Sequence, residues 1–302
     1  MTHMTFASLD LDAICATMQE AVGLAIEIIR GQRFTFTVIK TGSGAQTSAD
    51  ILAQQAYLSL LRERFPTFGI IAEEGELRSP CTDPSGNSVY FTVDSLDGTN
   101  AFIRRQSHGI GTMVSCVCND TVIAAYVGDV LTRDVYGFRY DQPGVTHDWE
   151  NKRVRLLSYD ESTNIEHAHI SLRRNPSAHQ RIFRDLAASS ASPDGTVGLC
   201  AHLDIETGSI GISTARLWKG EVAAMVLWPV RETPWDMTPI FGITKHLGFI
   251  QVEFHQKGHD LIVMATVPLK TTLEEPKPRL TIHASALPRL RTWHEDWKLR
   301  SR

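Results

Sequence analysis

Two aspartates three residues apart, Asp94 and Asp97, form the most chemically suggestive pair in the sequence. In a turn, this spacing can aim both carboxylates at one point, and hard divalent cations such as Mg²⁺ prefer oxygen ligands. Gly98 and Thr99 follow, and a helix that begins there would present unpaired N–H groups to a phosphate. A simple hairpin turn at Asp97-Gly98 explains the same residues. An EF-hand is excluded, because Arg105 stands where its closing glutamate belongs.

Other carboxylates stand at the ends of predicted elements. Glu73 and Glu74 end a short apolar run upstream of Asp94, and Asp236 precedes an apolar helix. Taken singly, Asp236 and Asp50 are typical of helix caps. The presence of all these groups in one chain favours a shared acidic cluster.

The elements that must position these residues follow from hydrophobic spacing. Apolar residues at helical intervals predict a helix over 9–29, stopped by Gly31, and a second helix over about 48–64. Apolar runs over 68–72 and 89–93 predict strands that deliver carboxylates at their C-terminal ends. Rigid strand ends beside open loops are a good place to build a site.

The rest of the chain is predicted to alternate strands and helices. Segment 141–152 is expected to be a polar loop and the boundary between an N-terminal half, 1–150, and a C-terminal half, 151–302. The tail beyond residue 274 is expected to hold one helix. Before the boundary, strands over 112–118, 121–127 and 134–138 form an antiparallel meander. After it, strands are expected over 169–172, 222–227, 249–254 and 261–267, with helices starting near Pro176, Asp236 and Leu287.

The composition of the 302 residues, 42% hydrophobic and 21% charged, is that of a globular protein. A formal net charge of −4 without a polybasic run makes nucleic acid and anionic membranes unexpected partners. No leader pattern or membrane-length apolar span is recognised, so a membrane protein is not expected. The five cysteines follow neither a redox nor a zinc spacing, which favours reduced thiols and a cytoplasmic location.

The order of three acidic motifs resembles the inositol monophosphatase superfamily over nearly the whole chain. The motifs are Glu73-Glu74, Asp94-Ser95-Leu96-Asp97-Gly98-Thr99 and Trp235-Asp236. The superfamily includes inositol phosphatases, bisphosphate nucleotidases, histidinol-phosphatases and fructose-bisphosphatases. The resemblance implies an α+β fold of layered αβαβα architecture with two sheets, and often a homodimer.

The resemblance also implies an activity and a cofactor. The chain is expected to be a Mg²⁺-dependent phosphatase that hydrolyses a small-molecule phosphate monoester (sugar, amino-alcohol or nucleotide phosphate) by metal-activated water. Glu73, Asp94 and the carbonyl of Leu96 are implied ligands of a first Mg²⁺. Asp94, Asp97 and Asp236 are implied ligands of a second, and Glu73 of a weaker third.

Other roles are carried over in the same way. Thr99 and Asp50 match the pair that orients and deprotonates the attacking water, and Glu73 is counted with them as catalytic. The N–H groups of Gly98 and Thr99 are implied to bind the phosphate. The alternative is a non-catalytic regulatory protein that binds phosphate or metal on the same fold; loss of Thr99 or Asp50 would have favoured it.

Departures from the family pattern concern mainly the substrate. Inositol-specific members carry a glutamate where this chain has Pro229, so myo-inositol phosphate is not expected to be preferred. Ser209, Arg231 and Glu232 are the candidate substrate-binding residues. Ser95 replaces a usual proline, a change expected to be tolerated.

One more departure follows the Trp-Asp motif, where the family usually has small residues. Here Met237, Thr238 and Pro239 stand in their place. Pro239 is expected in a first helical turn, where its missing N–H costs little.

Overall fold

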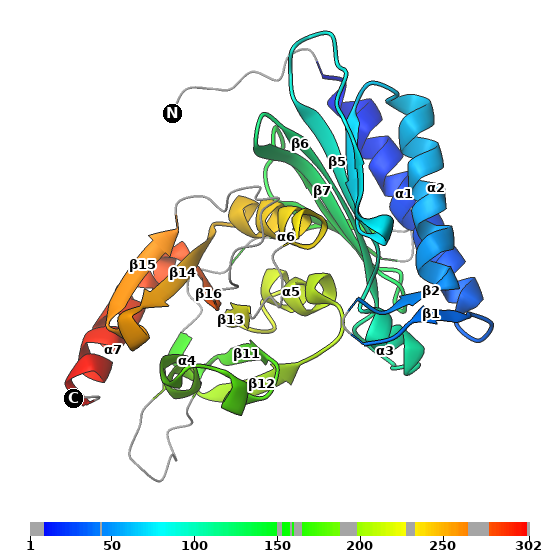
Figure 1. The fold of residues 1–302 in the computed structure, drawn as a ribbon. Helices are drawn as coiled ribbons and strands as arrows, with labels where there is room; N and C mark the ends of the chain where they lie inside the picture. Colours follow the sequence, from blue (N-terminus) through cyan, green and yellow to red (C-terminus); the bar gives the residue numbers. More distant parts are fainter. Residues whose placement is uncertain are drawn as a thin grey trace. The chain divides into compact units, whose positions relative to one another are not determined.

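The computed structural model describes residues 9–42, 44–149, 153–157, 159, 165–187, 198–227, 233–264 and 278–300. The chain forms two compact units, each with its own large sheet (Figure 1). The first comprises Met1–Leu156, Gly208–Ile212 and Pro234–Ile243, and the second comprises Leu157–Thr207, Ser213–Thr233 and Thr244–Arg302. Two segments from the C-terminal half therefore belong to the first unit. Within the described ranges, no helix is both long and apolar enough to cross a membrane.

Two long helices pack side by side on one face of the first sheet (Figure 1). α1 (Leu11–Gln32) continues through Gly31, so the predicted stop at that glycine is wrong by one residue. α2 (Ser48–Arg64) has the predicted bounds. It begins with a capping box, in which the Thr47 side chain accepts from backbone N–H and Asp50 accepts from the Thr47 N–H.

The first sheet has eight strands in the order β10-β9-β8-β7-β6-β5-β3-β4. β5 to β9 pair antiparallel in sequence order, which confirms the meander, and β3 runs parallel to β5. The bounds are β3 Gly69–Ala72, β4 Leu77–Ser79, β5 Val89–Asp97, β6 Gly111–Cys118, β7 Thr121–Asp129, β8 Val135–Arg139, β9 Val145–Trp149 and β10 Arg153–Leu157. The loop prediction for 141–152 is wrong over β9, whose polar sequence hides a strand that pairs with β8.

Successive side chains of β5 point to opposite faces of this sheet. Phe91 and Val93 join the core under α1 and α2, whereas Thr92 and Asp94 face the other side. Smaller elements complete the unit: the hairpin β1 (Val38–Lys40) and β2 (Gln46–Thr47), the 3₁₀ turn η1 (Glu74–Glu76) and α3 (Thr99–Ile103).

Two glycines let helical segments lie directly on the second face. A side chain on Gly211, at the start of α5 (Ile210–Trp218), would come within 2.6 Å of the Met113 sulfur. One on Gly242, in α6 (Pro234–His246), would come within 2.7 Å of Phe138. The segments of α5 and α6 that belong to this unit are thus held close to the strands.

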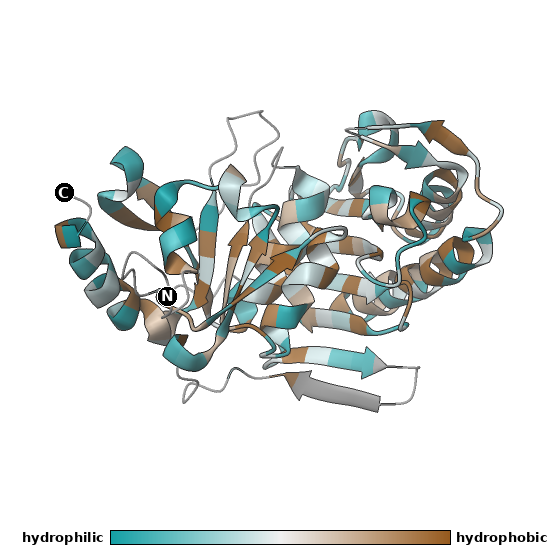
Figure 2. Ribbon diagram, turned by 90° about the horizontal axis from the view of Figure 1, so that it is seen from below, coloured by the Kyte–Doolittle hydropathy of each residue, from teal (hydrophilic) through white to brown (hydrophobic). Residues whose placement is uncertain are grey.

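The second unit contains a six-stranded sheet in the order β12-β11-β13-β16-β14-β15. β11 is parallel to β12 and β13, and the other pairs are antiparallel. The bounds are β11 His169–Arg173, β12 His202–Glu206, β13 Ala224–Leu227, β14 Phe249–His255, β15 Asp260–Met264 and β16 Arg279–His283. β16 is fully buried at the centre, although the tail was expected to hold only a helix. Hydrophobic residues run through the strands of both sheets (Figure 2).

The helices of the second unit partly match their predictions. The helix expected at Pro176 is a single 3₁₀ turn, η3 (Pro176–Ala178), followed by α4 (Arg181–Leu186). α7 (Leu287–Arg300) confirms the terminal helix, and its Trp293 and Trp297 join α4 in the core of this unit.

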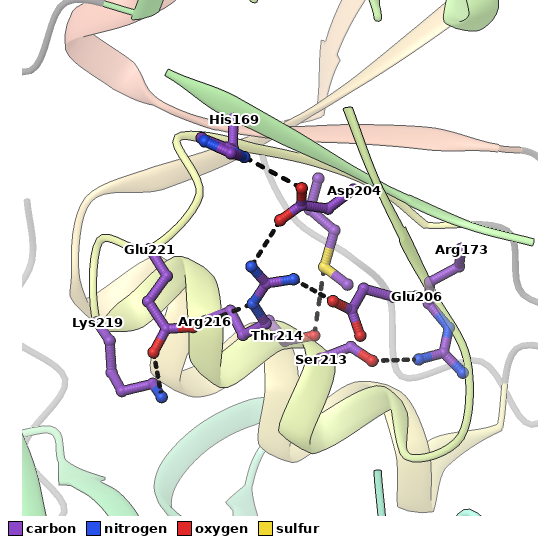
Figure 3. A network of polar contacts seen from close by, with 10 residues as sticks. His169, Arg173, Asp204, Glu206, Ser213, Thr214, Arg216, Lys219 and Glu221 are labelled. Atoms are coloured by element: carbon purple, nitrogen blue, oxygen red, sulfur yellow. Dashed lines mark hydrogen bonds and ion pairs between the residues drawn. The ribbon is translucent and has the colours of Figure 1, made fainter. Parts of the chain in front are cut away.

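A charged network surrounds Arg216 in the second unit (Figure 3). Its guanidinium group donates to Asp204 at 2.6 Å, to Glu221 at 3.0 Å, and to Glu206. Lys219 forms a second ion pair with Glu221 at 2.5 Å. Three carboxylates on β12 and beyond α5 are therefore neutralised by cations of the same unit.

Candidate active site

A bulge at the end of β5 explains how two aspartates three residues apart reach the same face. In a regular strand, residues i and i+3 point to opposite faces. Here Asp94 pairs with Met113 and Asp97 with Gly111, so three steps on β5 match two on β6. The extra residue turns Asp97 to the side of Asp94, as bulges beside functional sites commonly do. The sequence had predicted a turn at this place.

Three carboxylates converge on this face of the first unit. One oxygen from each of Asp94, Asp97 and Asp236 lies within 4.8 Å of the others. Asp94 and Asp97 come from β5, and Asp236 comes from the first turn of α6 rather than from a capping position before it. The first unit thus contains all three motifs on which the family resemblance rests.

Glu73 lies beside Asp94 at the end of β3. Burial raises the pKa of both groups well above their ordinary values, and repulsion from neighbouring carboxylates adds to it. A divalent cation bound between these carboxylates would offset their mutual repulsion, so the oxygen-only donor set fits Mg²⁺.

Asp97 is also hydrogen-bonded to the start of α5. Its carboxylate accepts from the Ile210 N–H at 3.0 Å and the Gly211 N–H at 2.7 Å. The Ser209 hydroxyl donates to it as well and accepts from the Ile212 N–H at 2.9 Å. These donors at a helix N-terminus stabilise the anionic form of Asp97. Ser209, proposed to contact substrate, is fully buried in this arrangement.

Thr99 and Asp50 lie within hydrogen-bond distance. The Thr99 hydroxyl is 2.9 Å from Asp50 Oδ1 and 3.0 Å from the carbonyl of Leu96. Asp50 Oδ2 is occupied by the Thr47 N–H at 2.8 Å, so the capping box and the Thr99 contact use different oxygens. Asp50 is therefore both a helix-terminus residue and a partner of Thr99. Burial raises its pKa, although hydrogen bonds from Thr47 and Thr99 oppose the shift.

Gly98 is required by the backbone and by packing. Its φ is 92°, in the left-handed region, and a Cβ would lie 2.4 Å from the Gly109 carbonyl oxygen. Fold geometry alone thus demands glycine here. Its N–H and that of Thr99 stand at the start of α3, the position proposed for phosphate.

Two polar residues near the cluster were not predicted to be site residues, although Ser95 was noted as a departure from the family pattern. The side-chain amide of Gln54 makes two hydrogen bonds with the backbone of Glu74. It donates to the Glu74 carbonyl and accepts from the Glu74 N–H, both at 2.9 Å. The Ser95 hydroxyl donates to the Asp50 carbonyl at 3.0 Å, in place of the family's proline. No sequence signal marks Gln54, because a glutamine in a helix is ordinary.

Several predictions of substrate contacts stay untested. Pro229, Arg231 and Glu232 lie outside the described residues. Pro239 is described, and it stands inside α6 rather than in its first turn, because the helix already begins at Pro234. All five cysteines are free, and burial raises the pKa of thiols such as Cys200, which makes them poor nucleophiles.

Comparisons with known proteins identify relatives. The curated 3'(2'),5'-bisphosphate nucleotidases CysQ of Escherichia coli (strain K12) and Shigella flexneri are 31% identical over 101 residues, which span 32% of this chain and only 38% of those proteins. An IMPase of Thermotoga maritima superposes with a TM-score of 0.68 at 16% identity, covering 95% of this chain and 98% of that one. The inositol monophosphatase of Anabaena (Nostoc) sp. PCC 7120 gives 0.68 and 16%, covering 95% and 97%.

The structural neighbours confirm the layered α+β fold, with helices and two mixed sheets. The model of the inositol monophosphatase family matches residues 10–287, which confirms the resemblance drawn from the three motifs. This chain belongs to the inositol monophosphatase family.

Proposed function

We propose that this protein is a Mg²⁺-dependent phosphatase that hydrolyses the phosphate monoester of a small molecule. The observation that carries the proposal is the 2.9 Å contact between Thr99 and Asp50 beside an acidic cluster. A cation-binding protein without catalysis has no need of a hydroxyl connected to a buried base. Family membership supports the same reaction class.

The residues that would hold the metal are those assigned by the resemblance. Glu73, Asp94 and the Leu96 carbonyl would bind one Mg²⁺, and Asp94, Asp97 and Asp236 a second. Magnesium would supply Lewis-acid chemistry, stabilising negative charge on phosphate and favouring ionisation of water.

Thr99 and Asp50 would prepare the attacking water. The Thr99 oxygen would accept a hydrogen bond from the water, while the Thr99 hydroxyl donates to Asp50 Oδ1. Asp50 keeps its orientation because Thr47 holds the other oxygen. Its raised pKa makes it a stronger base than an exposed aspartate. The N–H groups of Gly98 and Thr99 would bind a phosphate oxygen.

The substrate class is best tested with nucleotides first. The local match to 3'(2'),5'-bisphosphate nucleotidases favours a nucleotide bisphosphate over the sugar and amino-alcohol phosphates. Pro229 supports the proposal that myo-inositol 1-phosphate is a poor substrate, and Arg231, Glu232 and Ser209 remain proposed substrate contacts. A homodimer and a cytoplasmic location are also proposed, supported by the family resemblance and by five free cysteines.

A phosphate-release assay on a metabolite panel, with Mg²⁺ or with chelator, tests the proposal. The panel should include 3',5'-bisphosphate nucleotides, sugar phosphates, amino-alcohol phosphates and myo-inositol 1-phosphate. We expect Mg²⁺-dependent release from at least one compound. Mg²⁺ binding without release from any of them would instead support a regulatory protein. If myo-inositol 1-phosphate is the best substrate, the interpretation of Pro229 is wrong and the phosphatase assignment stands.

A further inference from the structure

Three buried hydroxyl groups join α6 to the sheet within the first unit. Thr92 Oγ1 on β5 lies 2.7 Å from Ser115 Oγ on β6, and Thr238 Oγ1 on α6 lies 2.6 Å and 2.7 Å from them. Thr238 is also 2.6 Å from the Pro234 carbonyl, to which it can donate. This hydroxyl triangle of Thr92, Ser115 and Thr238 is buried from solvent.

The hydroxyl triangle fixes the position of α6 by directional contacts. Three hydroxyl protons are shared among four short contacts, so at most three of these contacts are hydrogen bonds at one time. If α6 moved along the sheet, these hydroxyl groups would lose hydrogen-bond partners in an interior without water, at a cost in free energy. Apolar packing at Gly242 alone would tolerate such a slide more easily.

α6 also has a local weakness that this contact offsets. Pro239 lies inside the helix and has no N–H to donate to the Trp235 carbonyl. The backbone ladder is thus interrupted in the turn that carries Asp236. A tertiary contact from the neighbouring Thr238 is well placed to hold that turn.

The hydroxyl triangle lies two residues from a carboxylate on each element that it connects. Thr92 precedes Asp94 by two positions on the same face of β5, and Thr238 follows Asp236 by two positions in α6. We propose that Thr238 is a positioning residue of the metal centre, which sets Asp236 against Asp94 through Thr92 and Ser115. The inference rests on the proposed function, since it assumes that these carboxylates bind the metal.

Thr238→Val tests the inference because it removes the hydroxyl and nearly keeps the shape. Thr92 and Ser115 still satisfy each other, so the variant is expected to fold. Titration calorimetry of metal-stripped protein with Mg²⁺ should show an affinity about 10-fold weaker than wild type, as for lost outer-shell contacts. Thr238→Ser retains the hydroxyl and should restore the affinity to within about 3-fold of wild type.

Thr17→Val is a matched control. Thr17 is buried in α1 of the same unit, and its hydroxyl donates to the Ala13 carbonyl four residues earlier at 2.7 Å, as Thr238 does to Pro234. It should lower the melting temperature in chelator and leave Mg²⁺ affinity unchanged. If Thr238→Val fails to fold, Ser115→Ala serves instead, with a weaker affinity expected.

The outcomes separate this inference from the proposed function. Wild-type Mg²⁺ affinity in Thr238→Val, with a loss of melting temperature like that of Thr17→Val, would overturn the positioning role. Failure of the wild-type protein to bind Mg²⁺ would overturn the proposed metal centre, and the inference with it. Weaker binding in Thr238→Val that Thr238→Ser corrects supports the role even if the substrate is still unknown.

Discussion

The two units each gather acidic side chains, with opposite electrostatic results. In the second unit, burial opposes the charged form of Asp204, yet hydrogen bonds from His169 and Arg216 lower its pKa below the ordinary value (Figure 3). In the first unit, burial raises the pKa of Glu73 and Asp94, and the charged groups that act most on them are further carboxylates. One cluster thus favours ionised carboxylates, and the other resists ionisation.

The difference lies in the source of positive charge. Arg216 belongs to the chain, so its network contributes to the fold without any ligand. The carboxylates around Asp94 are buried and repel one another, so a cation that binds from solution would stabilise them most. A buried cluster of carboxylates whose pKa values are raised is therefore a better indicator of function than acidic residues as such.

Asp94→Asn should give the largest effect. Because Asp94 is the proposed shared ligand, activity should fall by about 10³-fold or more, the equivalent of several kcal/mol of metal stabilisation. In chelator the variant should melt no lower than wild type, since a repelled buried carboxylate has gone. Asp204→Asn is the control from the other cluster, and it should keep activity while losing stability. Near-normal turnover of Asp94→Asn would show that the cluster around Asp94 matters no more for activity than the network around Arg216.

Thr99→Ala should come next, with kcat lowered by about 10²-fold or more and Mg²⁺ affinity nearly unchanged. Asp50→Asn should lower kcat similarly, because the base for the Thr99 proton is weakened. Thr99→Ser keeps a hydroxyl and should recover most of the rate. Kinetics at saturating Mg²⁺ and calorimetry check both expectations. Loss of metal binding with unchanged kcat would show that these residues serve the metal and not the water.

Arg216→Met should act on stability alone. The Arg216 network is half-buried, so its contribution to stability should lie between those of exposed and of buried ion pairs. The free energy of unfolding should therefore fall by about 1–3 kcal/mol. Urea unfolding with and without Mg²⁺ should give the same loss. Arg133→Met removes an exposed pair with Glu27 and should cost at most about 1 kcal/mol. A loss no greater than in that control would show that the Arg216 network contributes little.

The pH dependence of the same variant should give the smallest effect. The pKa values of Asp204 and Glu221 are lowered in the folded state, so their stabilisation is complete above the ordinary values of 3.8 and 4.5. It is lost as the pH falls through the lower folded values. The stability gap between wild type and Arg216→Met should thus shrink as unfolding is measured from pH 7 toward about pH 3. A gap that stays constant would contradict ionic stabilisation.

The sequence predicted best where a local signal had one meaning. α2 has its predicted bounds because a capping box starts it and Phe65-Pro66 follows it. The antiparallel meander and the family were likewise readable. The Asp94–Asp97 bulge was not, because a bulge depends on pairing with β6, which lies elsewhere in the chain.

Burial that depends on distant partners explains the other errors. β16 reads Arg-Leu-Thr-Ile-His, too polar for a central strand until Glu253 pairs with Arg279 at 2.9 Å. The hydroxyl triangle was equally hidden, since Thr92 and Ser115 lie 146 and 123 residues from Thr238. The acidic motifs and their order along the chain could be recognised in the sequence. The groups that hold these carboxylates in place could be identified only from the fold.

The central place of β16 has a consequence for synthesis on the ribosome. β13 pairs with β11 and β16, and β14 pairs with β15 and β16. Until residues 279–283 leave the exit tunnel, this sheet can exist only as two separate ribbons with open edges. Such edges invite wrong pairing. We therefore expect the nascent second unit to become resistant to protease only after residues 279–283 have left the exit tunnel, so that chaperones have a long time in which to bind it.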